Sequence, residues 1–143
     1  MLSRVVTQER SEEMQSIVQS VSRWAADHDD VHGVVVVGSW ARGTARMDSD
    51  IDMVVLTDAA PYADAQMWTR LLEGQVTRLQ QWGPVREVRL QRLSGFEVEL
   101  GIAPLTWAST TPVDAGTDRV INDGHRIVYD PDGVLAALSA ACQ

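Results

Sequence analysis

The sequence contains a single cysteine and no lysine, and each scarcity narrows what the chain can be. Cys142 has no partner for an intramolecular disulfide and belongs to no Cys/His zinc spacing, which favours a reducing compartment and a cytoplasmic location. No stretch approaches the roughly 20 consecutive apolar residues of a membrane-spanning helix, so no membrane association is expected. All twelve basic residues are arginines, so any cationic side chain that contacts a phosphate must be a guanidinium group.

The charge balance and the length exclude further classes of protein. The formal net charge of −8 predicts repulsion from nucleic acid, because lysine and arginine supply most of the affinity for phosphate backbones. The 143 residues, of which 45% are hydrophobic, are enough for one compact core without disulfides or a structural metal. We therefore predict one domain that spans residues 1–143.

The hydrophobic pattern of the first half predicts, in order, a helix over residues 8–26, strands over 31–37 and 50–56, and a helix over 63–82. The first helix has Thr7 or Ser11 as its candidate cap. The second has an apolar stripe and ends at Gly83-Pro84, where a helix is expected to stop. The stripe consists of Trp68, Leu71, Leu72, Gln75, Leu79 and Trp82.

The second half is predicted to contain strands over residues 85–92, 96–103 and 126–129 and helices over 117–123 and 134–141. The first two of these strands are separated by Leu93-Ser94-Gly95, a spacing that suits a tight antiparallel hairpin. The order of all these elements predicts an α/β (α+β) fold with a small mixed β-sheet flanked by helices.

The segment GSWARGTARMDSDIDMVVL, residues 38–56, combines a glycine-serine turn with two closely spaced aspartates. Gly38 lets the backbone bend sharply after a strand, and Ser39 adds a hydroxyl beside backbone N–H groups, which together suit phosphate oxygens. Gly43 permits a second bend. Asp50 and Asp52 are two residues apart on a predicted strand, so both carboxylates project from one face and can converge on one or two hard cations.

A third acid is expected on the strand that contains Glu97 and Glu99. If that strand lies beside the one that begins at Asp50, one of these glutamates reaches the same cations. Alternating acids are also typical of the solvated face of an antiparallel strand. Spacing alone leaves both glutamates open; the family resemblance given below favours Glu99, which lies in mid-strand between Val98 and Leu100, with Glu97 as the alternative.

These residues resemble the DNA polymerase beta-type nucleotidyltransferase superfamily, whose signature is a GS turn, a spacer and a D-x-D strand. The likeness is closest to small bacterial members, the minimal nucleotidyltransferases and the catalytic core of antibiotic nucleotidyltransferases. The resemblance implies that Gly38 and Ser39 contact the phosphates of an NTP, with ATP the expected donor. It also implies that Asp50 and Asp52 hold two magnesium ions and that a third carboxylate positions or deprotonates the attacking hydroxyl.

The implied reaction is attack by an acceptor hydroxyl on the α-phosphorus of the NTP, with pyrophosphate leaving. Arg42 and Arg46 are candidates for contacts to the triphosphate, although either could equally be a paired or solvated loop residue. Trp24, Trp68 and Trp82 fall at helical spacing, which favours a role in core or interface packing, and Trp40 is expected to anchor the motif loop to the core.

The acceptor cannot be read from the residues, and three functions stay open. The first is nucleotidyl transfer to a hydroxyl of a small molecule or a protein. The second is an antitoxin-like minimal nucleotidyltransferase that modifies a partner toxin. The third is a nucleotide-binding domain without turnover, which a glutamate in place of the more usual aspartate at the third position would allow. A homodimer or a partner protein could complete the acceptor site.

Overall fold

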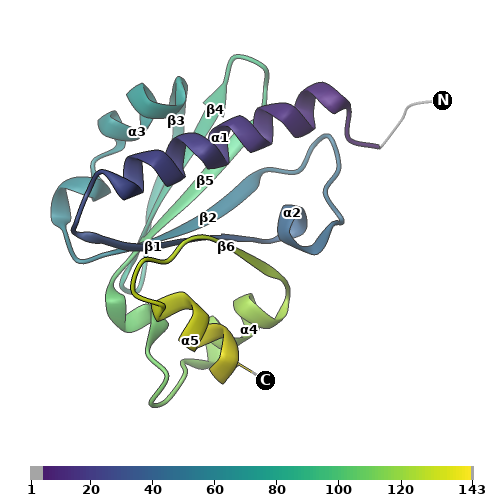
Figure 1. Cartoon of the computed structure of the whole chain (residues 1–143). Helices are drawn as coiled ribbons and strands as arrows, with labels where there is room; N and C mark the ends of the chain where they lie inside the picture. The colour runs from purple at the N-terminus through teal and green to yellow at the C-terminus, as the bar shows by residue number, and fades with distance from the viewer. Residues whose placement is uncertain (1–4, 143) are drawn as a thin grey trace.

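The computed structural model describes residues 5–142 and shows a six-stranded mixed sheet with helices on both faces (Figure 1). The strands are β1 (Val31–Val37), β2 (Ile51–Thr57), β3 (Gly74–Trp82), β4 (Val85–Arg92), β5 (Glu97–Ala103) and β6 (His125–Tyr129). Their spatial order is β3-β4-β5-β2-β1-β6, and β2–β5 is the parallel pair, whereas the other neighbouring pairs are antiparallel. The fold class predicted from the sequence is confirmed.

The helices are α1 (Gln8–Ala26), α2 (Ser39–Arg42), α3 (Ala65–Leu72), α4 (Ala115–Asn122) and α5 (Val134–Ala141), with short 3-10 turns η1 (Ala60–Ala63) and η2 (Leu105–Ala108). The predicted bounds of α1 and α5 are confirmed, and Thr7 is the residue that caps α1. Its side chain accepts a hydrogen bond from Arg10 N–H. None of the helices within residues 5–142 is both long and apolar enough to cross a membrane.

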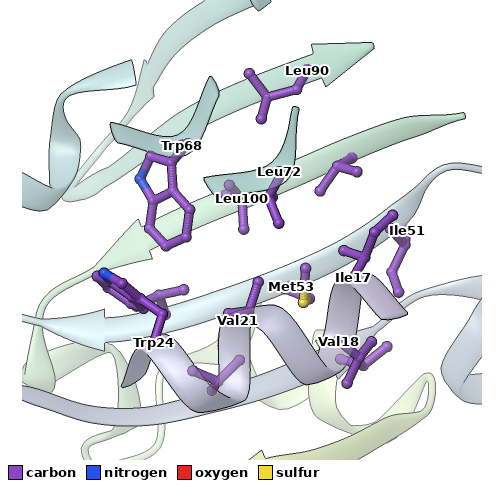
Figure 2. Packing of buried hydrophobic residues seen from close by; sticks show 14 of the residues in the cluster. Ile17, Val18, Val21, Trp24, Ile51, Met53, Trp68, Leu72, Leu90 and Leu100 are labelled. Carbon is purple, nitrogen blue, oxygen red and sulfur yellow. The ribbon is translucent and has the colours of Figure 1, made fainter. Parts of the chain in front are cut away.

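One face of the sheet, here called the first face, is covered by α1 and α3 (Figure 1). Apolar side chains of these two helices pack on side chains from β2, β4 and β5, as Figure 2 shows. The fully buried members include Val21, Trp68, Ile51, Leu90 and Leu100. Burial of this surface is the main stabilising contribution to the fold.

The opposite face, here called the second face, is only partly covered. Over β1 and β2 it packs against α4, α5 and η2, through residues that include Val35, Leu56, Ile121, Leu135 and Leu138. Over β4 and β5 it carries the charged side chains Glu87, Arg89, Glu97 and Glu99. Strand alternation produces this division, because successive side chains point to opposite faces.

The predicted helix over residues 63–82 is wrong in its second half. The helix ends at Leu72, Glu73 takes a left-handed conformation (φ 55°), and the chain continues as β3. Gly74 and the β-branched pair Val76-Thr77 weaken a helix at this point, and pairing with β4 satisfies the backbone instead. Gly83 and Pro84 therefore form the turn of a hairpin. Trp82, predicted to be in a core or interface, is 56% exposed at the end of β3.

Candidate functional site

Three carboxylates converge on the second face. Asp50 precedes β2, Asp52 lies within it, and Glu99 lies on β5 directly beside Asp52 in the parallel register. One oxygen from each residue lies within 4.8 Å of the others, close enough for the three to share a metal ion. Glu97 is not part of this group, so the geometry favours Glu99 as the third acid.

Gly38 forms one wall of this site. Its backbone has φ 79° and ψ −155°, a region that residues with a side chain rarely adopt. A Cβ at this position would lie 2.7 Å from Asp52 Oδ2, so the glycine also makes room for the carboxylate. The glycine-serine turn and the two aspartates are thus one structural unit.

Burial and the proximity of other acids disfavour the charged forms of Asp52 and Glu99. Burial, with the charge of Asp50, raises the pKa of Asp52 to about 6 despite an opposing hydrogen bond with Glu99. Burial, with hydrogen bonds to Glu87 and Asp52, raises the pKa of Glu99 to about 9. Asp52 Oδ1 is buried and has no hydrogen-bond partner among residues 5–142. A divalent cation would stabilise the charged carboxylates and would give Asp52 Oδ1 a partner.

Arg89 on β4 contacts this group directly. Its Nη1 lies 2.9 Å from Asp50 Oδ2 and 3.1 Å from Glu99 Oε2, and its Nη2 lies 2.8 Å from Glu97 Oε2. Burial lowers the pKa of Arg89, but the hydrogen bond to Glu97 and the neighbouring charges raise it above the usual value. The guanidinium therefore stays charged in the cluster.

A second charged group continues from the acids toward the edge of the sheet. Glu87 is 2% exposed; it accepts hydrogen bonds from Arg78 and, at 2.6 Å, from the Trp82 indole N–H. Hydrogen bonding to Glu99 and then to Arg78 and Trp82 lowers the pKa of Glu87 to about 2, against the opposing effect of burial. Arg78 Nη2 also lies 3.8 Å from Glu99.

A cavity of about 330 Å³ opens beside the carboxylates. Asp52, Glu99 and Gly38 contribute to one side of it, and Trp107 and Val120 contribute apolar surface. Arg42 and Asp123 add charged groups of opposite sign to the lining, and both side chains are exposed. The cavity therefore joins the acid cluster to an apolar wall and to polar groups that could orient a ligand.

The other residues predicted for the site lie at different distances from it. Ser39 starts α2 directly after Gly38, and Gly43 ends α2 with φ 77° and lines a separate hollow with Trp40. Arg46 is paired with Asp48 on an exposed loop. The structure therefore brings Arg42, but not Ser39, Gly43 or Arg46, to the lining of the cavity beside the acids. Trp40 anchors the loop as expected, by packing against the core.

The sequence patterns did not single out Arg89, Glu87 or the residues of the cavity wall. Arg89 could have been found, because a hairpin with a three-residue loop at 93–95 places it opposite Glu99, as the observed pairing shows. Glu87 follows from the same alternation. Trp107, Val120 and Asp123 had no comparable signal, because they come from η2 and α4, whose packing no local pattern specifies.

The residues present fit a magnesium site. Carboxylate oxygens are the ligands that this hard cation prefers, three are gathered within one ion's reach, and one buried oxygen has no hydrogen-bond partner in the described part of the chain. Such a group can hold phosphates through bound cations, beside a glycine turn that lets a ligand approach the backbone.

Comparison with known sequences points the same way. The sequence pattern of the nucleotidyltransferase domain matches residues 15–105, which is more than half of the chain. This range includes the glycine-serine turn and all three carboxylates. No curated protein sequence matches the chain closely enough to count as a relative.

Solved structures share the fold at low sequence identity. A cytoplasmic RNA terminal U-transferase has a TM-score of 0.51 and 19% identity, with 68% of this chain and 30% of that chain covered. Cid1, an RNA terminal uridylyl transferase, gives 0.51 and 19%, with 68% and 32% covered. The Cid1 poly(U) polymerase with MgGTP bound gives 0.50 and 18%, with 68% and 33% covered. The chain thus spans about a third of the length of these proteins.

Proposed function

The chain belongs to the nucleotidyltransferase domain family, and from this premise we propose that it transfers a nucleoside monophosphate from an NTP to a hydroxyl group. The acceptor oxygen would form a bond to the α-phosphorus, the bond to pyrophosphate would break, and the hydroxyl proton would pass to a base. The observation that carries the proposal is the convergence of Asp50, Asp52 and Glu99 within 4.8 Å.

Each residue has a proposed task in this reaction. Asp50 and Asp52 hold magnesium, with two ions expected, and Glu99 completes the ligand set and orients the acceptor hydroxyl. Bound magnesium supplies charge neutralisation on the triphosphate and a lower pKa for the acceptor hydroxyl. Gly38 and Ser39 hold phosphate oxygens, and Arg42 adds a forked contact from the cavity lining.

We propose ATP as the donor, and the cavity wall supports this choice. Trp107 and Val120 offer apolar surface to a nucleobase. The Asp123 carboxylate can accept a hydrogen bond from the exocyclic amine of adenine, a group that guanine and cytosine share, whereas uracil offers only its ring N3–H. Selectivity for UTP is therefore not carried over from the uridylyl transferases that share the fold.

The proposed acceptor is a hydroxyl of a small molecule or a protein. RNA is named for the structural neighbours, but this chain has a net charge of −8, and an acidic surface disfavours a phosphate polymer. A second copy of the chain or a partner protein could complete the acceptor site. A cytoplasmic location, expected from the single cysteine, stays a prediction.

The test is magnesium-dependent pyrophosphate release from each of the four NTPs, with aminoglycosides, simple alcohols, candidate partner proteins and a short RNA as acceptors. Asp52→Asn should lower the rate by about a thousandfold or more, because a neutral amide is a poor magnesium ligand and several kcal/mol of transition-state stabilisation are lost. The control is Asp48→Asn, which removes the same charge from an exposed loop acid and should leave the rate unchanged.

Three results would change or narrow the proposal. Magnesium-dependent ATP binding without pyrophosphate release against any acceptor would favour the nucleotide-binding domain without turnover. A transferase rate that is equal in the wild type and Asp52→Asn would contradict the assignment of the acids. Label transferred to a partner protein alone would support the antitoxin-like function.

A further inference from the structure

Arg89 contacts two of the carboxylates that the proposed metal ion would need. One nitrogen, Nη1, lies 2.9 Å from Asp50 Oδ2 and 3.1 Å from Glu99 Oε2, and these are two of the three proposed ligand residues. A carboxylate oxygen that accepts a charge-assisted hydrogen bond has less electron density available for a cation. The guanidinium therefore neutralises two of the same carboxylates as a metal ion would, and it carries the same sign of charge.

The other end of the guanidinium has a separate partner. Nη2 of Arg89 lies 2.8 Å from Glu97 Oε2, and Glu97 is on the same face of β5 as Glu99 but outside the group of three ligands. Arg89 is held on β4 opposite Glu99, so its backbone stays fixed while its long side chain can turn. It can thus give up the contacts at Nη1 and keep the contact at Nη2.

We propose that Arg89 is a resident counter-cation, which competes with divalent ions for Asp50 and Glu99 and remains on Glu97 when an ion takes those two carboxylates. The inference rests on the proposed function, because it takes these acids as metal ligands. It assigns Glu97 a task of its own: holding the displaced guanidinium and so favouring the metal-bound arrangement.

A competing Arg89 and a merely positioning Arg89 predict opposite changes in metal-ion affinity when the side chain is removed. If Arg89 only orients Asp50 and Glu99 for the metal, its removal loosens the ligands and weakens ion binding. If Arg89 competes, its removal frees two carboxylates and strengthens ion binding. A charge in direct contact shifts the proton affinity of a carboxylate by one to three pKa units, so a change in cation affinity of about tenfold is expected.

The experiment is a titration of the full chain with Mn²⁺, in the absence of nucleotide, in which the free ion is followed by its electron paramagnetic resonance signal. Arg89→Gln should bind Mn²⁺ about tenfold more tightly than the wild type. Arg86→Gln is the matched control. Arg86 is on the same strand as Arg89 but on the opposite face of the sheet, the face that also carries the buried Val88 and Leu90. This substitution should change the affinity by less than about twofold.

Glu97→Gln provides a second test. The single variant is measured in the wild-type background and so does not depend on the folding of the arginine variant. It should weaken Mn²⁺ binding by about threefold or more, because Arg89 then lacks its alternative partner. In the Arg89→Gln background the same change should alter the affinity by less than about twofold. Melting curves of each variant would show that the comparison is made between folded proteins.

The outcomes separate the inference from the proposed function. Equal or weaker Mn²⁺ binding by Arg89→Gln, or an equal effect of Glu97→Gln in both backgrounds, would overturn the competition. Absence of Mn²⁺ binding in the wild type and in Arg89→Gln alike would overturn it too. If the affinities follow the prediction and no NTP turns over, the competition stands and the proposed transferase activity fails.

Discussion

Over β4 and β5, the two faces of the sheet are built from the same strands but have opposite chemistry. On β5, Val98, Leu100 and Ile102 point into the apolar layer under α1 and α3, whereas Glu97 and Glu99 point to the second face. The first face stabilises the fold through buried apolar surface. The second face gathers acids that repel one another and so costs stability in the absence of a cation.

This contrast indicates how the chain positions a reactive cluster. The acids are held close together because the backbone that carries them is fixed from behind by the first face. A shift of one residue in strand register would exchange the two sets of side chains and bury the acids. Substitutions on the first face should therefore change stability, and those around the acids should change binding and catalysis.

The largest stability effect is expected on the first face. Trp68, on α3, is fully buried against the sheet, and its indole N–H donates to Tyr62 C=O at 2.8 Å. Trp68→Ala should lower the free energy of unfolding by about 4 kcal/mol, because it creates a large cavity in the core. The measurement is urea denaturation followed by circular dichroism.

Trp82→Ala is the matched control from the second face. Trp82 is 56% exposed and makes one hydrogen bond to Glu87, so its removal should cost only about 1 kcal/mol. Equal losses for the two tryptophans would contradict the division between a stabilising face and a functional face.

Among the charged residues of the second face, Glu87 is the one that we expect to contribute clearly to stability. Glu87→Gln should cost about 2 kcal/mol, because the carboxylate is buried and accepts hydrogen bonds from Arg78 and Trp82. This loss is smaller than that expected for a fully buried ion pair, because the Arg78 side chain is 47% exposed. Glu12→Gln, on the exposed side of α1, should be neutral in the same denaturation assay.

The smallest expected effect is a pH dependence of stability caused by Tyr62, which packs against the first-face cluster. Burial and a 2.7 Å hydrogen bond to Asp30 raise the pKa of Tyr62 to about 12 from an ordinary value of 10.0. The folded protein holds this proton more tightly, so the stabilisation is complete below pH 10 and is lost as pH rises through 12. The stability advantage of the wild type over Tyr62→Phe should therefore shrink across this range. A stability difference between the wild type and Tyr62→Phe that grows with pH would contradict the raised pKa of Tyr62.

The sequence predicted the parts of the fold that depend on local pattern. The β-branched run of β1, the apolar periodicity of α1 and the spacing of the β4–β5 hairpin were all sufficient. The segment after Leu72 was mispredicted because its apolar residues also fit helical spacing. There the choice depends on pairing with β4, which is a tertiary interaction.

The site was predictable for a similar reason, but only in part. Gly38, Asp50 and Asp52 lie in one short segment, and alternation limited the third acid to Glu97 or Glu99. The choice between these two required the parallel register of β2 and β5, which sets Asp52 beside Glu99. The cavity wall formed by Trp107 and Val120 required the packing of η2 and α4 onto the second face.

The assignment of Asp50, Asp52 and Glu99 as joint ligands of divalent ions rests on the convergence of their carboxylates. Its most direct test is a crystal structure of the chain with Mn²⁺ and a non-hydrolysable ATP analogue, recorded at a wavelength where manganese scatters anomalously. We expect an anomalous peak within about 2.0 to 2.3 Å of oxygens from these three residues, with the triphosphate beside Gly38. A bound analogue with no anomalous peak at these carboxylates would contradict the account.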